Sequence, residues 1–195
     1  TTRYYVNGVL QVTPAVTAGP PLAITGITIP AGGNVIVVYE ADLNQYAPLG
    51  EEAEITNTVT VSGGGITPIT AQETIQVEME PLLTITKSVS PVPVTENGTL
   101  TYTFVIQNFG NTAATVETGA VVTDTFDPIL KDLTVSYNGT AWTEPTEYTY
   151  NETTGEFATV IGEITVPAAT YTQDAETGAW IVTPGMGTLI VTGTV

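Results

Sequence analysis

The sequence contains no histidine and no cysteine among its 195 residues. Without imidazole and thiolate ligands, zinc, copper, haem and thiol sites of the ordinary kind are excluded, and so is a Ser-His-Asp triad. The lack of cysteine also means that no disulfide can stabilise the fold. No cofactor is therefore expected, and the chain is not expected to be an enzyme.

Basic residues are almost missing as well, since three Lys and Arg stand against 20 Asp and Glu, for a net charge of −17. Nucleic acids and anionic membrane surfaces both attract proteins through Lys and Arg, so neither is expected as a partner. No apolar run approaches the ~18 residues that suggest a membrane-spanning helix. The opening residues TTRYYVNG do not read as a signal peptide, so an export signal would already have been removed or would lie outside this sequence.

The residues that are present are typical of β-structure. The chain is 42% hydrophobic with 19 Gly and 13 Pro, and it is rich in Thr, Val, Ile and Tyr. Convincing helical periodicity is absent. Only 12% of the residues are charged, and Thr, Ser, Asn and Gly supply the remaining polar surface. This composition predicts an all-β protein and favours an extracellular, secreted one.

Alternating apolar and polar residues, punctuated by Gly and Pro turns, predict a series of strands. Glu80-Pro81 interrupts the pattern and suggests a domain boundary. The expected strands are Tyr4–Val12 (with an Asn7-Gly8 turn), Leu22–Ile29, Asn34–Ala41, Ile55–Ser62, Ala71–Met79, Leu83–Val89, Leu100–Asn108, Ala120–Phe126, Leu133–Tyr137, Thr146–Tyr150, Glu156–Val166, Ala169–Thr172, Ala179–Thr183 and Leu189–Val195.

An internal repeat is visible. PAGGNVIVVYEA (Pro30–Ala41) aligns without a gap with PGMGTLIVTGTV (Pro184–Val195), and Tyr5–Gly8 resembles Tyr137–Gly139. The second copy carries an insertion at about 142–180, of which Trp142–Thr159 is rich in Thr, Tyr and Glu.

The repeat predicts that residues 1–80 are the rear part of one β-sandwich and that 83–195 form a second one without its closing strands. The chain is therefore out of phase with its repeat. Either it is a piece of a longer protein of neighbouring repeats, or the missing strands are donated by another part of the chain or by another copy.

LTITKSVSP, LTYTFVIQNFGNTA and VVTDTFDP, together with ITNTVTVSG, resemble the surface-protein repeat catalogued as domain of unknown function 11. The resemblance covers residues 83–126 well, 30–80 fairly and 127–183 poorly. It implies immunoglobulin-like antiparallel β-sandwich repeats in large secreted proteins of bacteria and archaea, often stalks, fibres or wall-associated chains. It implies no enzymatic activity.

Three polar residues fall at inward positions of the expected strands. Lys87 shares a face with Leu83, Ile85 and Val89, while Asp124 lies between Val122 and Phe126. Asn57 lies between Ile55 and Val59 in the same way. Since a buried charge is costly unless it is paired, these positions are candidates for a site.

Two interpretations of Lys87, Asp124 and Asn57 stay open. In sandwich domains of bacterial surface fibres, such a trio often forms a spontaneous Lys–Asn amide beside a carboxylic acid. Burial and fixed packing would then let the Lys87 amine displace ammonia from the Asn57 carboxamide. The alternative is a buried Lys87–Asp124 ion pair, with Asn57 only capping the sheet. Asp124 and Asp127 are also weak candidates for calcium.

Two function classes remain. The first is a structural module of a cell-surface stalk, appendage or self-assembling fibre, with copies of itself or neighbouring repeats as partners. The second is an adhesin-like module that binds host or cell-wall glycan or protein through an aromatic patch. That patch would comprise Tyr148, Tyr150, Phe157, Tyr171 and Trp180. A glycosidase pair among Glu51, Glu52 and Glu54 is disfavoured, because these residues lie in a loop beside a strand and a solvated acidic loop is the better explanation of them.

Overall fold

The computed structural model describes residues 1–195 except 13, 20 and 51–52, and it divides into two units, Thr1–Asn44 and Gln45–Val195. Its elements are antiparallel strands, with one short 3-10 helix η1 (Val116–Thr118). The all-β prediction is therefore confirmed.

The first unit holds two small sheets. One is three-stranded, in the order β2-β1-β5, and the other is the pair β3-β4. Of the unit's described residues only Tyr4 is buried. The strands are β1 (Thr2–Val6), β2 (Val9–Gln11), β3 (Ala15–Thr17), β4 (Ala23–Thr25) and β5 (Val35–Tyr39).

The second unit begins with a long hairpin, β6 (Glu54–Gly63) and β7 (Ile66–Gln76). Its second strand starts at Ile66, not at Ala71 as expected. Gly64 and Gly65 both have positive φ, at 59° and 79°. This lets the chain reverse within a tight turn and resume pairing at once.

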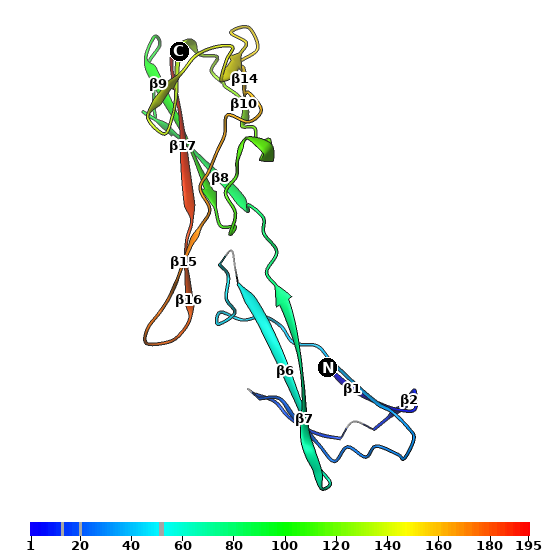
Figure 1. Ribbon diagram of the computed structural model, residues 1–195. Helices are drawn as coiled ribbons and strands as arrows, with labels where there is room; N and C mark the ends of the chain where they lie inside the picture. Colours follow the sequence, from blue (N-terminus) through cyan, green and yellow to red (C-terminus); the bar gives the residue numbers. More distant parts are fainter. Residues whose placement is uncertain (13, 20, 51–52) are drawn as a thin grey trace. The chain divides into compact units, whose positions relative to one another are not determined.

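The rest of the second unit is a β-sandwich (Figure 1). A five-stranded sheet, in the order β12-β11-β17-β9-β8, faces a three-stranded sheet, β10-β14-β13. A separate pair, β15-β16, precedes the last strand. The strands are β8 (Leu83–Ser90), β9 (Thr99–Asn108), β10 (Thr123–Thr125), β11 (Lys131–Tyr137), β12 (Thr140–Trp142), β13 (Tyr148–Tyr150), β14 (Glu156–Thr159), β15 (Thr170–Gln173), β16 (Trp180–Thr183) and β17 (Gly185–Thr194).

The core lies between these two sheets. From the large sheet, β9 alternates so that every second residue is buried, and β17 does the same. From the other layer, Phe157 of β14 and Phe126 pack against them, and the Tyr102 and Phe126 rings are 4.7 Å apart. The strand expected over Glu156–Val166 ends at Thr159, because the chain turns at Gly162, where φ is 92°.

A three-stranded pattern occurs in both units. The sheet β2-β1-β5 has the same strand order as β12-β11-β17. At the ends of the aligned strands, Val6 pairs with Val35 in the first unit and Tyr137 pairs with Leu189 in the second. These pairs lie at equivalent positions of the repeat that the sequence shows.

The turns of the two units match as well. Asn7 and Asn138 open Asn-Gly hairpin turns with φ of 50° and 49°. The Asn7 side-chain oxygen accepts a hydrogen bond from the Asn34 backbone amide at 2.9 Å, and Asn138 accepts one from Thr188 at 2.8 Å. The side chain of each asparagine therefore joins its turn to the strand that follows in the repeat.

Candidate functional site

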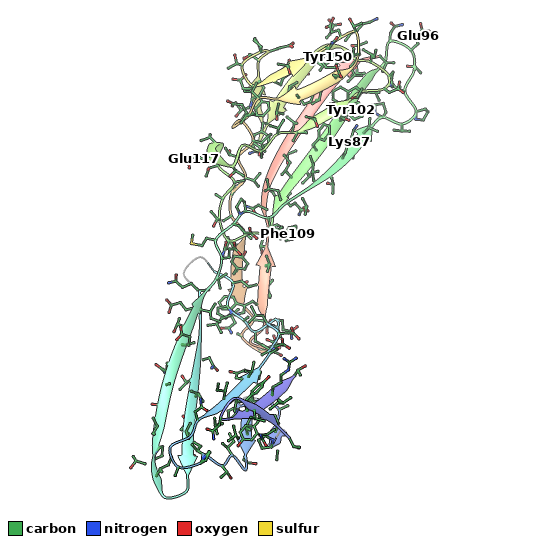
Figure 2. All side chains as sticks on the ribbon, turned by 90° about the vertical axis from the view of Figure 1, so that its right-hand side faces the viewer. Lys87, Glu96, Tyr102, Phe109, Glu117 and Tyr150 are labelled. Carbon is green, nitrogen blue, oxygen red and sulfur yellow. The ribbon has the colours of Figure 1, made fainter. Side chains whose placement is uncertain are left out.

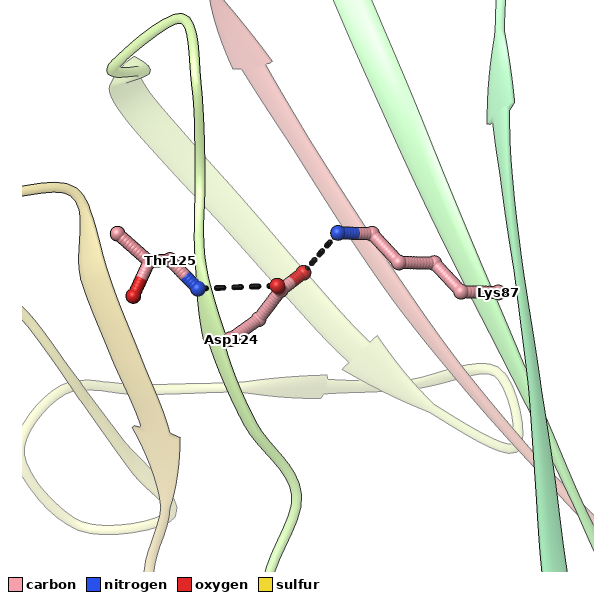
Figure 3. Close-up of polar contacts among 3 residues, drawn as sticks. All are labelled: Lys87, Asp124 and Thr125. Atoms are coloured by element: carbon pink, nitrogen blue, oxygen red, sulfur yellow. Dashed lines mark hydrogen bonds and ion pairs between the residues drawn. The ribbon is translucent and has the colours of Figure 1, made fainter.

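Lys87 and Asp124, two of the predicted site residues, come together at one side of the sandwich (Figure 3). Lys87 is on β8, the edge of the large sheet, and Asp124 is on β10, the edge of the small sheet. The Lys87 ammonium forms an ion pair with Asp124 Oδ2, while Oδ1 accepts a hydrogen bond from the Thr125 amide at 2.9 Å. The expected Lys87–Asp124 ion pair is therefore present, and it links the two sheets.

The Lys87 ammonium also lies among aromatic rings. It is 4.7 Å from the centre of the Tyr102 ring and 5.7 Å from those of Phe104 and Phe126. Figure 2 shows Lys87 and Tyr102 next to each other in the sandwich. Rings at this distance attract a cation through their electron-rich faces, which adds to the attraction of the carboxylate.

The pair is only partly covered. The Lys87 side chain is 41% exposed and that of Asp124 is 17% exposed. Asp124 Oδ2 is itself buried, and among the described residues it has no hydrogen-bond partner apart from the Lys87 ammonium. A carboxylate oxygen has room for a further donor, so the site has unused hydrogen-bonding capacity.

The strand that carries Lys87 is uncovered on its inner face. Ile85 and Val89 pair across the strands with Ile106 and Tyr102, which places them on the core side of the sheet. Ile106 and Tyr102 are buried, but Ile85 is 52% exposed and Val89 is 37% exposed. The small sheet ends at β10 and leaves this part of the large sheet without a facing layer.

The β6–β7 hairpin has two unlike faces. On one face, threonine and glutamine side chains form cross-strand hydrogen bonds, such as Thr56–Thr74 and Gln72 to Thr58 at 2.9 Å. On the other face lie aliphatic side chains that are exposed or half-buried. This apolar face comprises the cross-strand pairs Ile55–Ile75, Val59–Ala71 and Val61–Ile69, with Asn57–Glu73 among them.

Asn57 is exposed and lies opposite Glu73 on the hairpin. The expectation that it points into a core within this chain is wrong, because nothing in the described residues covers that face. The alternation of Ile55, Asn57 and Val59 indicated which face is apolar but could not indicate what covers it. The structure therefore does not bring Asn57 to Lys87 within one chain.

Asn108 and Asn111 form a clamp that sequence reasoning missed. Asn108, with no exposed surface, accepts hydrogen bonds at Oδ1 from the Leu82 and Gly110 amides, both at 2.9 Å. Its Nδ2 donates to the carbonyls of Thr112 and Pro167. The side-chain amide of Asn108 therefore uses its full hydrogen-bonding capacity, and these bonds hold the surrounding loops together.

Asn111 holds the linker that enters the sandwich. Its Oδ1 accepts from the Glu80 amide at 3.1 Å and its Nδ2 donates to the Glu78 carbonyl at 2.9 Å. Gly110 lies so close that a Cβ there would meet the Glu80 carbonyl oxygen at 2.1 Å. The signal for this clamp in the sequence is Asn108-Phe109-Gly110-Asn111, a pattern that by itself is typical only of a turn.

The expected aromatic patch is wrong for two of its members. Tyr148 and Phe157 are buried, and their rings stack 5.6 Å apart in the core. They belong to β13 and β14, so this part of the insertion builds the small sheet. Tyr150 bonds both the amide and the carbonyl of Leu130.

Tyr171 and Trp180 of the same set are half-buried on the β15–β16 pair. The Tyr171 hydroxyl donates to the Phe109 carbonyl at 2.9 Å. The Trp180 backbone amide donates to the Gln45 carbonyl. Adhesion through the insertion stays a prediction, with three partly exposed aromatic residues instead of five: Tyr150, Tyr171 and Trp180.

The remaining acidic candidates do not converge. Asp127 is exposed, and the Asp124 carboxylate is engaged by Lys87. Glu54 is exposed at the start of β6, while Glu51 and Glu52 lie outside the described residues. Across the residues that the structure describes, no group of three or more acidic side chains is arranged to hold a metal ion.

Burial raises the pKa of four tyrosines of the sandwich unit, with desolvation as the largest cause in each: Tyr137, Tyr148, Tyr150 and Tyr171. The pKa values of two carboxylates of the insertion are shifted in the other direction. The Thr143 backbone amide lowers the pKa of Glu147, and the Thr177 backbone amide lowers that of Asp174. Through these hydrogen bonds, Glu147 and Asp174 fasten loops of the insertion.

No family model, no curated protein and no solved structure matches this chain. In the described part of the chain, no helix is both long enough and apolar enough to cross a membrane.

Proposed function

We propose that this protein is an extracellular structural module of a cell-surface stalk, appendage or self-assembling fibre, without catalytic activity. The observation that carries the proposal is the repeated three-stranded pattern with matching register and turns. Stacked like units extend a chain in one dimension, so their number and junctions set its length and stiffness. The composition, in which only 12% of the residues are charged and few are lysine, supports a location outside the cell.

The clamp at Asn108 and Asn111 also supports a mechanical role. A flexible linker would let the β6–β7 hairpin rotate freely relative to the sandwich that follows it, whereas hydrogen bonds to the backbone at Glu78, Glu80 and Leu82 fix the direction in which the chain enters the sandwich. Stiffness at a junction is what a rod or fibre requires.

Protease treatment of intact cells that produce the protein tests the location. We expect surface protease to remove it while a cytosolic marker survives. Complete protection in intact cells, with digestion only after lysis, would contradict the proposal.

The clamp is tested in the purified full chain with Asn111→Ala. We expect limited proteolysis within residues 77–82 to accelerate about fivefold or more, since losing two hydrogen bonds of about 1 kcal/mol each favours local opening. Asn151→Ala, which removes side-chain bonds to the Thr153 and Thr154 amides in a distant loop, is the matched control. Equal cleavage of both variants and the parent would contradict a clamped junction.

A further inference from the structure

We infer that the β6–β7 hairpin of one copy docks through its apolar face onto the uncovered inner face of β8 in a second copy, beside β10. The inference deepens the proposed function, because it names the partner and the surface through which modules would assemble.

Both surfaces expose aliphatic side chains to water, so each is stabilised by being covered. A two-stranded hairpin is marginally stable alone in water, and this one exposes Val59, Val61, Ile69 and Ile75. The sandwich in turn leaves Ile85 and Val89 uncovered on the core side of β8. Joining the faces removes both sets of aliphatic side chains from water.

The number of strands fits as well. The large sheet has five strands and the small sheet has three. One hairpin placed against the free edge of β10 would give the small sheet as many strands as the large one. It would also cover the part of β8 that lacks a facing layer, and β10 would gain a partner for its free edge.

The polar residues on the two faces are complementary. Ile85, Lys87 and Val89 alternate on β8 as Ile55, Asn57 and Val59 alternate on β6. Opposed faces in this arrangement bring Lys87 to the Asn57–Glu73 pair.

Glu73 then places a second carboxylate, after Asp124, beside the Lys87 ammonium. Lys87 is one of three basic residues in a chain of net charge −17. The Asn57 amide can donate to Asp124 Oδ2, the buried oxygen that has no partner besides Lys87.

The repeat indicates the same place for the hairpin. After β5, the last strand of the first unit, the chain continues directly to β6 and β7. Since β5 corresponds to β17, a hairpin of this kind belongs to the sandwich that contains a β17-like strand. β17 pairs on its far side with β9, which in turn pairs with β8.

A second copy is the occupant because the linker prevents the same copy from docking. To lie on its own β8, the hairpin would have to reverse direction within residues 77–82. The backbone there is held at Glu78, Glu80 and Leu82 by Asn111 and Asn108. Folding back would break these bonds.

Sedimentation of the full chain over a range of concentrations tests the inference. We expect reversible association of the parent and at least about 100-fold weaker association of Val59→Asp/Val61→Asp, since two buried valines are each worth more than tenfold. Thr58→Asp/Thr60→Asp adds the same charge to the opposite face of the same strand and should associate like the parent. A parent that stays monomeric, or two variants that weaken association equally, would overturn the inference.

Crosslinking locates the contact, because the chain has no cysteine of its own. Val59→Cys and Ile85→Cys variants are mixed and treated with a bismaleimide that spans the ~10 Å between packed sheets. We expect a mixed dimer from this pair and none from Thr58→Cys with Ile85→Cys. Crosslinking equal to that of the control pair, or a monomeric product from Val59→Cys/Ile85→Cys in one chain, would overturn docking between copies. The proposed function is tested separately by the surface and linker experiments, which do not require the hairpin to dock.

Discussion

The sheets β2-β1-β5 and β12-β11-β17 have the same order, matching pairs at their ends and the same Asn-Gly turn, yet they have different surroundings. In the second, Val135, Leu189 and Val191 are buried under the small sheet. In the first, Val35 and Val37, the equivalents of Leu189 and Val191, are only half-buried. Local sequence therefore determines strand pairing and turn, whereas burial depends on which strands lie alongside.

The largest expected effect is a difference between equivalent core positions. Val191→Ala should lower the free energy of unfolding by ~2–3 kcal/mol, because it removes fully buried methyl groups and leaves a cavity. Val37→Ala, the same change at the equivalent half-buried position of β5, should cost less than about 1 kcal/mol. Calorimetric unfolding of the full chain measures both. Equal losses would show that the first unit is as well packed as the second.

The next effect concerns the Lys87–Asp124 pair, which has no equivalent among the described residues of the first unit. Lys87→Met should cost about 1–2 kcal/mol, because it leaves Asp124 Oδ2 buried without a donor. Lys131→Met, on the exposed side of β11, is the control and should be nearly neutral. Denaturant unfolding followed by Trp142 and Trp180 fluorescence measures both variants. An unchanged midpoint for Lys87→Met would contradict a stabilising pair.

Intact mass under denaturing conditions completes this prediction. The ion pair predicts the full mass for the parent. A mass short by one ammonia, or a covalent ladder of oligomers that Lys87→Ala abolishes, would show the Lys87–Asn57 amide instead.

Much of this site could be predicted from the sequence. Period-two alternation placed Lys87 and Asp124 on inward faces, and the structure confirms that they meet. The same reasoning failed for Asn57, because alternation identifies an apolar face but not the layer that covers it. It failed for Tyr148 and Phe157 because an insertion was assumed to be surface, whereas it supplies strands of the small sheet. Asn108 was missed because its role depends on loops far apart in the sequence.

The Asn-Gly turns of the two units, unlike their core positions, should respond to mutation in the same way. Asn7→Ala and Asn138→Ala should each cost about 1–2 kcal/mol in their own unit, through positive φ and one lost hydrogen bond. Hydrogen exchange of peptides from each unit measures the local effect. If only Asn138→Ala had an effect, the turns of the two units would not be equivalent.

The smallest expected effect is a dependence on alkaline pH. Burial raises the pKa of Tyr137 and Tyr148 above the ordinary value of 10.0. Their contribution to stability is complete below that value and is lost as the pH rises through the folded-state pKa. The melting temperature of the sandwich should therefore fall as the pH is raised above about 10. Ultraviolet titration in which all tyrosines ionise at the ordinary value while the chain is folded would contradict this.

Hydrogen exchange of the β6–β7 hairpin at increasing protein concentration tests assembly through the hairpin most directly. We predict that amides of Glu54–Gly63 and Ile66–Gln76 exchange quickly in dilute solution and become at least about tenfold more protected as copies associate. Val59→Asp/Val61→Asp should remove the concentration dependence, and Thr58→Asp/Thr60→Asp should keep it. Exchange of the hairpin that is equally fast at every concentration would contradict docking between copies.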